Sequence, residues 1–147
     1  MTEFPVEAWQ AHVQEYLNCL ELCQAFRRRA DDTHIQEALD ALLDEGQDVL
    51  ASLAGCLRQQ GAAPGALELD RRGKAAVREL LALRALRDQL LMVRRSLAGL
   101  VAWHAAHLPV GGDDPATEDL LAPLLAQTRH MLDRWDQHLA DMGAAKQ

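Results

Sequence analysis

Apolar residues recur at alternating steps of three and four along four stretches of the chain, which is the spacing of one buried helix face. In the first stretch these positions are Val6, Trp9, Val13, Tyr16, Leu20 and Cys23. In the second they are Ile35, Leu39, Leu42, Gly46, Val49, Leu53 and Cys56. Similar stripes follow in the second half of the chain. The pattern predicts four helices, at about residues 5–30, 32–60, 71–108 and 115–142.

Residues that end or begin helices separate these stretches. Asp32 is placed to cap the second helix, and Pro115 suits the first turn of the last one. Two glycines and a proline in residues 61–65 end the second helix, and the stretch to about Asp70 is expected to be a crossover. Residues 1–147 are therefore expected to form one all-α domain, an antiparallel up-down-up-down four-helix bundle. Pro123 is expected to kink the last helix or to mark the start of its regular part.

Composition and charge exclude several classes of partner. Lys and Arg number 15 against 22 Asp and Glu, and the net charge of -7 repels a phosphate backbone, so no nucleic-acid partner is expected. The longest uncharged run, residues 96–112, includes two histidines and ends in a proline and two glycines, so no membrane span is expected. The three cysteines lack a disulfide-framework spacing and the start lacks a signal peptide, which favours the cytoplasm.

The inward positions lack the ligands of a di-iron centre. Such a bundle needs a Glu from each of two helices and a Glu-x-x-His pair from each of the other two, all facing inward. The inward pairs with that spacing are here Gly46 with Val49 and Thr128 with Met131. None of these is a ligand for a hard metal ion, so no metal or other cofactor is expected.

The chain resembles the ferritin-like superfamily, and in particular its small bacterial bundles. From Ile35 to Gly65 the pattern of residue types is similar to that of the family's second helix and following turn. This stretch is IQEALDALLDEGQDVLASLAGCLRQQGAAPG. A weaker similarity runs from Leu90 to Met142. In that family the remaining Glu ligands would fall near positions that carry no carboxylate here: Tyr16, Leu17, Leu20 and Arg94. The resemblance therefore implies the fold with degenerate di-iron ligand positions.

A second interpretation retains the metal. If the helical register differs, iron could be bound by a set of acidic, amide and imidazole side chains, namely Glu21, Glu45, Asp48, Glu79, Gln127 and His130. Other metal hypotheses are weaker. His104 and His107 could bind a metal with His138, and Cys19 with Cys23 could hold a soft metal or form a redox pair.

Polar residues on or near the stripes predict a buried polar centre. These residues are Gln24, Glu79, Arg94 and His104. A buried guanidinium is costly unless it is paired, so we expect Arg94 to contact Glu21 or Glu45.

A second apolar stripe on the back of the 71–108 segment predicts an interface. Its residues are Val77, Leu81, Met92 and Trp103. Trp and Met are enriched at protein interfaces, so the stripe favours an antiparallel homodimer.

Three functions stay open from the sequence. The first is a non-catalytic ferritin-like bundle that acts as a structural or protein-binding module, with itself or another protein as partner. The second is a di-iron or other metal-binding oxidoreductase or stress protein. The third is a carrier of small apolar ligands, because Gly46 and Thr128 are small and could leave a cavity in the middle of the bundle.

Overall fold

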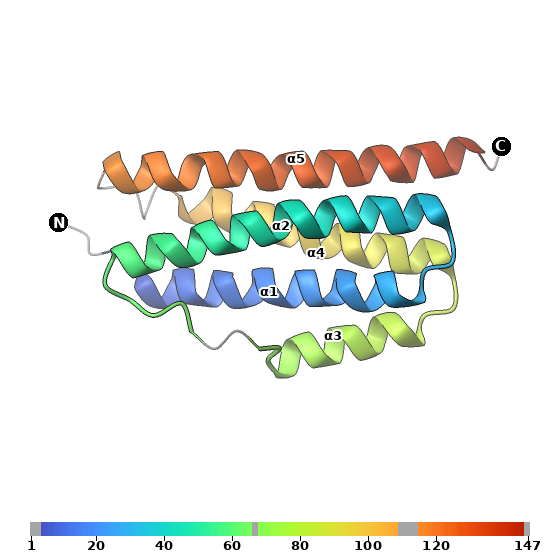
Figure 1. Cartoon of the computed structure of the whole chain (residues 1–147), viewed down its shortest axis with the longest axis horizontal. Coiled ribbons are helices and arrows are strands. Elements are labelled where there is room, and N and C mark those ends of the chain that lie inside the picture. The colour runs from blue at the N-terminus through green and yellow to red at the C-terminus, as the bar shows by residue number, and fades with distance from the viewer. Residues whose placement is uncertain (1–3, 66–67, 109–114, 146–147) are drawn as a thin grey trace.

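The computed structural model describes residues 4–65, 68–108 and 115–145, and they form five helices (Figure 1). The helices are α1 (Val6–Arg29), α2 (Thr33–Gln59), α3 (Arg71–Ala82), α4 (Leu86–His107) and α5 (Pro115–Ala145). No strand occurs among these residues, so the described chain is all-α as predicted. None of these helices is both long and apolar enough to cross a membrane.

Four of the helices surround a shared core. Helix α1 packs against α2 and α4, and α5 packs against the same two helices from the other side. Helix α3 packs against α1 (Figure 1). The largest fully buried apolar side chains come from all five helices: Trp9, Tyr16, Leu39, Leu53, Leu57, Leu80, Leu97 and Leu121.

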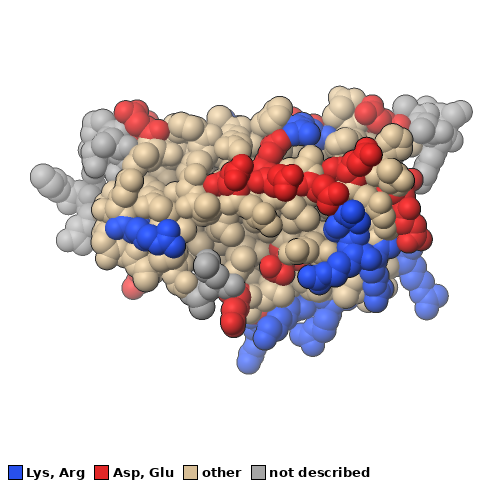
Figure 2. Space-filling view, in the orientation of Figure 1, with Lys and Arg blue, Asp and Glu red and all other residues tan. Residues whose placement is uncertain are grey.

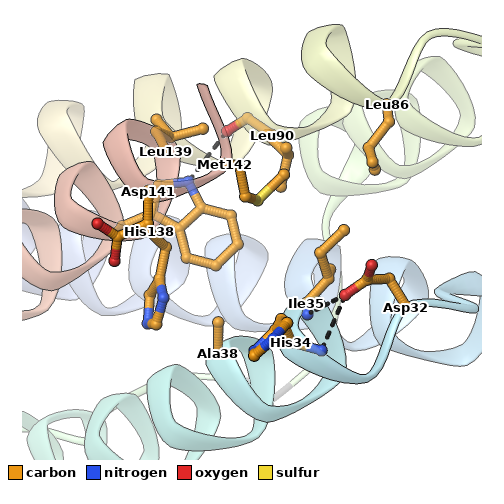
Figure 3. A pocket seen from close by; sticks show the side chains of 11 residues that line it. Asp32, His34, Ile35, Ala38, Leu86, Leu90, His138, Leu139, Asp141 and Met142 are labelled. Carbon is orange, nitrogen blue, oxygen red and sulfur yellow. Dashed lines mark hydrogen bonds between the residues drawn. The ribbon is translucent and has the colours of Figure 1, made fainter. Parts of the chain in front are cut away.

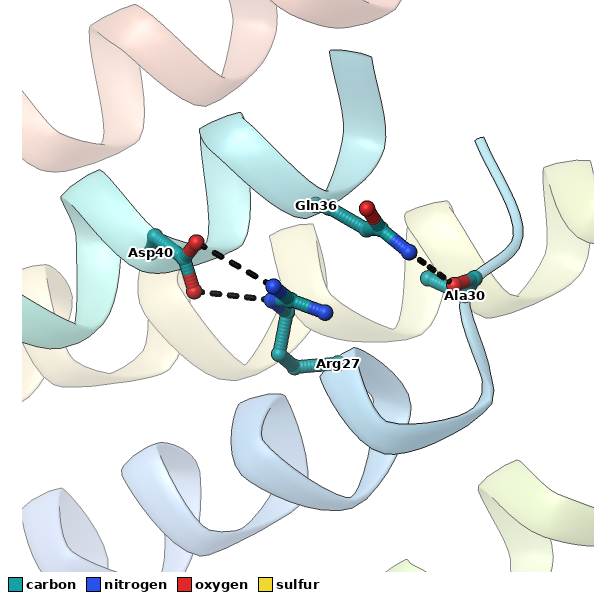
Figure 4. Close-up of polar contacts among 4 residues, drawn as sticks. All are labelled: Arg27, Ala30, Gln36 and Asp40. Atoms are coloured by element: carbon teal, nitrogen blue, oxygen red, sulfur yellow. Dashed lines mark hydrogen bonds and ion pairs between the residues drawn. The ribbon is translucent and has the colours of Figure 1, made fainter. Parts of the chain in front are cut away.

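The turn between α1 and α2 is held by polar contacts close in sequence (Figure 4). Asp32 caps α2, since its carboxylate accepts hydrogen bonds from the backbone N–H of His34 at 2.8 Å and of Ile35 at 3.2 Å. The Gln36 amide donates to the carbonyl of Ala30 at 2.6 Å. Arg27 and Asp40 form an ion pair between the two helices at 2.8 Å. These contacts fold α1 and α2 into the antiparallel hairpin that the sequence predicts.

The prediction of a single helix over 71–108 is wrong. The chain is extended at Leu83, where φ is -70° and ψ is 133°, and at Ala85, where φ is -82° and ψ is 126°. The direction reverses there, so α3 and α4 form a hairpin, and Figure 1 shows α4 running the same way as α2. The four core helices therefore run up-down-down-up, and not up-down-up-down.

The break separates two buried faces that point in different directions. Helix α3 buries Gly73 and Leu80, whereas α4 buries Leu90, Val93 and Leu97. At ~100° per residue these faces lie about 130° apart around a continuous helix. A single straight helix cannot turn both toward the same neighbours, so the chain breaks between them.

Helix α3 approaches α1 closely at its first turn. Asp70 caps α3 by accepting a hydrogen bond from the N–H of Gly73 at 2.8 Å, and the same oxygen accepts one from the Asn18 amide of α1 at 2.9 Å. A Cβ atom at Gly73 would overlap the Asn18 carboxamide and would lie 2.7 Å from Leu69 Cδ2. The glycine therefore permits the contact between the two helices.

The last helix is continuous through Pro123, which lies within α5. Proline has no N–H, so the helical hydrogen bond from this position is missing. The regular part of the helix nevertheless starts before Pro123, at Pro115.

We expect Gly73→Ala to lower the free energy of unfolding by about 1–3 kcal/mol, because its methyl group overpacks the contact between α3 and α1. The matched control is Gly99→Ala in α4, where an added Cβ meets no atom within 4 Å. This control should raise stability by about 0.5–1 kcal/mol, since alanine favours the helix interior. Urea unfolding followed by circular dichroism measures both changes. Equal effects of the two variants would contradict the close approach of α3.

Candidate functional site

The middle of the bundle is closed by contacts between α1, α2 and α5. Thr128 donates a hydrogen bond to the carbonyl of Leu124 at 2.8 Å, so its oxygen is free to accept one from the Tyr16 hydroxyl at 3.0 Å. The same Tyr16 hydroxyl lies 3.5 Å from the sulfur of Met131. Burial raises the pKa of Tyr16 well above its usual value, which keeps the phenol neutral and able to donate.

The expected cavity at Gly46 and Thr128 does not form. A Cβ atom at Gly46 would overlap Leu20 of α1 and would lie 3.3 Å from Met131 Cε. Thr128 is completely buried and occupied by its two hydrogen bonds. The small residues of α2 and α5 thus admit the larger side chains of their neighbours and leave no room for a ligand.

The residues of the alternative iron site do not come together. Asp48 and His130 are exposed, and Glu79 is exposed on α3, outside the four helices that share the core. Glu45 forms an ion pair with Arg134 of α5. Among the residues that the structure describes, no three His, Cys, Asp or Glu side chains lie close enough to hold a metal ion. Glu21 is half-buried and belongs to no such group, and Gln127 is half-buried on α5.

The expected buried polar centre is mostly not buried. Arg94 is 43% exposed and pairs with Asp136 of α5 at 2.6 Å, and not with Glu21 or Glu45. Its long side chain reaches the surface between α4 and α5, where it meets the carboxylate of Asp136. Glu79 is exposed because α3 leaves the bundle, and Gln24 is half-buried. His104 alone of the four predicted residues lies in the core.

The four predicted interface residues do not form one stripe. Val77 and Leu81 lie on α3, whereas Met92 and Trp103 lie on α4, and the chain reverses between the two helices. Val77, Met92 and Trp103 also pack against the hydrophobic core. The surface from which a homodimer was expected is therefore not continuous.

An aromatic and imidazole cluster occupies the space between α1 and α4. The ring of His12 stacks on Trp103 with centroids 4.3 Å apart, and Trp103 stacks on His107 at 3.8 Å. Trp9 meets the edges or faces of Trp103 and His104 at 4.9 and 5.1 Å. His12 was not among the residues predicted from the sequence, although it follows Trp9 by three residues and precedes Tyr16 by four, which places it on the same buried face.

Both buried histidines of this cluster stay neutral. Burial lowers the pKa of His12 to about 3, with smaller contributions from His104 and His107. Burial also lowers the pKa of His104 to about 4, although its contact with the Leu121 carbonyl acts in the opposite direction. A carbonyl can only accept, so His104 carries its proton on Nε2, which lies 3.0 Å from that oxygen. The two nitrogens of His12 have no hydrogen-bond partner among the described residues.

The three histidines of the other metal hypothesis do not come together. His138 lies beside Trp135, which bonds to Leu90 near the start of α4, whereas His104 and His107 lie at its end. All three cysteines are buried and free. The Cys23 thiol donates a hydrogen bond to Cys19, which lowers the pKa of Cys19. The pKa of Cys23 is raised because its thiol is the donor in this bond and because it is buried.

An apolar groove of about 370 Å³ opens where α2 begins and α5 ends (Figure 3). Its floor includes Trp135, whose indole N–H donates to the carbonyl of Leu90 at 3.0 Å and so ties α5 to α4. The apolar lining consists of Ile35, Ala38, Leu86, Leu90, Trp135, Leu139 and Met142. The polar lining consists of Asp32, His34, His138 and Asp141. Apolar walls with a few polar groups at the edge are typical of a binding site.

Comparisons of the chain with known protein families, with characterised proteins and with solved structures find no significant match. The function is therefore argued from the geometry above.

We expect the free energy of unfolding to fall as the pH is lowered from 7 toward 4. The folded pKa values of His12 and His104 lie below the 6.5 of free histidine, so the unfolded chain binds more protons in this range. Their stabilisation is complete above pH 6.5 and is lost as the pH approaches the folded values. Each histidine should account for a loss on the order of 2 kcal/mol between pH 7 and pH 5.

Urea unfolding at a series of pH values tests this expectation. In His12→Leu the loss of stability on acidification should be smaller, because one of the two buried imidazoles is gone. His130→Gln replaces an exposed histidine and should keep the dependence of the unmutated protein. A His12→Leu profile parallel to that of His130→Gln would contradict the neutral, buried state of His12.

Proposed function

We propose that the protein is a ferritin-like helical bundle without a di-iron centre, and that it acts by binding another protein. The connection between α2 and α4 supports the ferritin-like assignment. Ferritin-like bundles have four helices with one long crossover. Here residues 60–85, which include α3, connect the end of α2 to the start of α4 along the length of the bundle (Figure 1). The pattern of residue types from Ile35 to Gly65 agrees with this assignment.

The close packing in the middle of the bundle is the main support for a bundle without a di-iron centre. In a di-iron bundle the four helices direct carboxylates and imidazoles into this region. In this chain the space is filled by Leu20, the Tyr16–Thr128 hydrogen bond and Met131, with Gly46 in close contact. None of these groups is a carboxylate or an imidazole, the ligands that a di-iron centre uses. Restoring a carboxylate at Gly46 would require Leu20 and Met131 to move.

The apolar groove supports binding as the function. Its depth and apolar floor suit the insertion of side chains from one face of an amphipathic helix. Trp135 and Met142 are residue types enriched where proteins meet. Asp32 and Asp141 are exposed at its edge, and Figure 2 shows further acidic side chains across one face of the molecule. We infer that the partner presents a helix with an apolar face and basic flanking residues.

The size of the same groove favours a second candidate function, the carrying of a small apolar molecule. Its volume of about 370 Å³ lies in the range of ligand pockets, roughly 300–1,000 Å³. On this interpretation the acidic edge has no role in binding, which distinguishes the two candidates.

We expect no saturable binding of ferrous iron to the purified protein under anaerobic conditions. The melting temperature should not rise with added iron, and admission of oxygen should produce no absorbance band of an oxo-bridged ferric pair. The reason is that no three acidic, histidine or cysteine side chains among the described residues lie close enough together to hold a metal ion. About two irons per chain with such a band would contradict this proposal and favour the alternative iron site, whose residues are Glu21, Glu45, Asp48, Glu79, Gln127 and His130.

We expect a helical peptide of leucine and lysine to bind the protein, and Ala38→Met to abolish binding by filling the groove. The matched control is Ala51→Met, the same exchange at an exposed position of α2. Asp141→Asn should weaken the peptide several-fold and leave an uncharged apolar dye unaffected. Fluorescence anisotropy of labelled peptide measures the affinities. Binding of the dye alone would favour the small-ligand carrier, and equal binding by both methionine variants would overturn the groove as the site.

A further inference from the structure

We propose that a second cleft, between α1 and α4, binds a small organic anion with an apolar body, of the kind represented by benzoate. The cleft has a volume of about 450 Å³ and lies apart from the groove of Figure 3. Its lining combines charged side chains at the mouth with His12 and Trp103 at the base. This mixture differs from the apolar groove and points to a different ligand.

The charges at the mouth favour an anion. Arg95 of α4 is exposed and forms no ion pair with any residue that the structure describes. Arg72, at the start of α3, pairs with Glu15 of α1 at 3.0 Å, and the side chains are 80% and 41% exposed. The cleft therefore carries two guanidinium groups and one carboxylate, in a protein whose net charge is -7. A guanidinium without a partner is suited to bidentate binding of a carboxylate or phosphate group.

The base of the cleft provides polar groups without added charge. Ser96 is half-buried there, and His12 is only 1% exposed. The two ring nitrogens of His12 have no partner among the described protein groups, which is costly for a buried imidazole. Stacking against Trp103 at 4.3 Å fixes the ring in place. A ligand that reaches the base of the cleft would approach a hydroxyl and an imidazole held by packing.

Gly99 provides the room for the apolar body of the ligand. Glycine in a helix interior costs roughly 1 kcal/mol relative to alanine. At Gly46 and Gly73 a neighbouring helix explains the glycine, because an added Cβ atom would overlap it. At Gly99 an added Cβ atom would meet nothing within 4 Å, and the residue lines the cleft. Gly55 of α2 is equally open, so what distinguishes Gly99 is its place in the lining of the cleft, where a side chain would occupy the space available to a ligand.

Titration of the isotope-labelled protein with benzoate tests the proposal. Amide shifts should change saturably for residues 95–103 and around His12, while the shifts of the groove residues stay constant. Benzyl alcohol, which has the same body without the charge, should bind at least 10-fold more weakly. Inorganic phosphate distinguishes the alternatives for the anionic group: if it binds as tightly as benzoate, the apolar part of the proposal is overturned.

Two pairs of variants locate the site. Gly99→Leu should weaken benzoate binding at least 10-fold, whereas Gly55→Leu, the same exchange at a glycine of α2 that also has open space, should not. Arg95→Gln should weaken binding to a similar extent, whereas Arg58→Gln, at an exposed arginine of α2, should have no effect. Absence of saturable binding to the unmutated protein, or equal affinities within both pairs, would overturn the proposal. Ala38→Met serves as a test of independence and should leave benzoate binding unchanged.

Discussion

The enclosure of α1 on three sides is the constraint on which the rest of this structure depends. Helices α2, α3 and α4 all pack against it, so its buried surface extends beyond the single stripe expected of a bundle helix. Two polar residues of α1 are buried as a result, Asn18 outside that stripe and His12 beside it. Asn18 bonds to Asp70 where α3 begins, and His12 is packed among aromatic rings beside α4. The docking of α3 and the neutral state of His12 thus have the same cause.

The packed middle of the bundle and the two surface clefts define what the molecule can do. In the middle, hydrogen bonding between Tyr16 and Thr128 and the contact of Gly46 with Leu20 leave no space and no ligand set. Space is found instead at the surface, in the apolar groove between α2, α4 and α5 and in the charged cleft between α1 and α4. The chemistry of these two sites differs, because one has an acidic edge and the other carries Arg95, which forms no ion pair with any described residue. The two binding proposals rest on these surface sites.

The sequence predicted the inward residues of α1, α2 and α5 well. Gly46, Val49, Thr128 and Met131 are all buried, since each belongs to a long helix with one dominant apolar stripe. The same reasoning failed for 71–108, where a uniform run of helix-forming residues hid two stripes that are out of phase. No proline or glycine marks Leu83 to Ala85, so the break lacks the usual local signal. The one local indication of the break was that the apolar stripe shifts its angular position around the helix between Leu80 and Leu86.

Prediction of the site was limited for a related reason. The pattern places Arg94 on one side of its helix but does not say which acid lies across from it, and its partner Asp136 is 42 residues away in sequence. Likewise, His12 was recognisable as inward-facing, yet its stacking on Trp103 depends on how α1 and α4 cross. Neither cleft could be predicted, because each is formed by residues from helices that are distant in sequence.

The sequence alone determined the helical class, the bounds of α1 and α2 and the absence of metal ligands from the predicted inward positions. These properties follow from helical periodicity and from capping residues, which act over a few neighbouring positions. Only the tertiary structure decided that α3 leaves the bundle, that the core helices run up-down-down-up and that the clefts exist. Those features depend on which buried faces can meet in space, and that choice is made by packing between segments far apart in the chain.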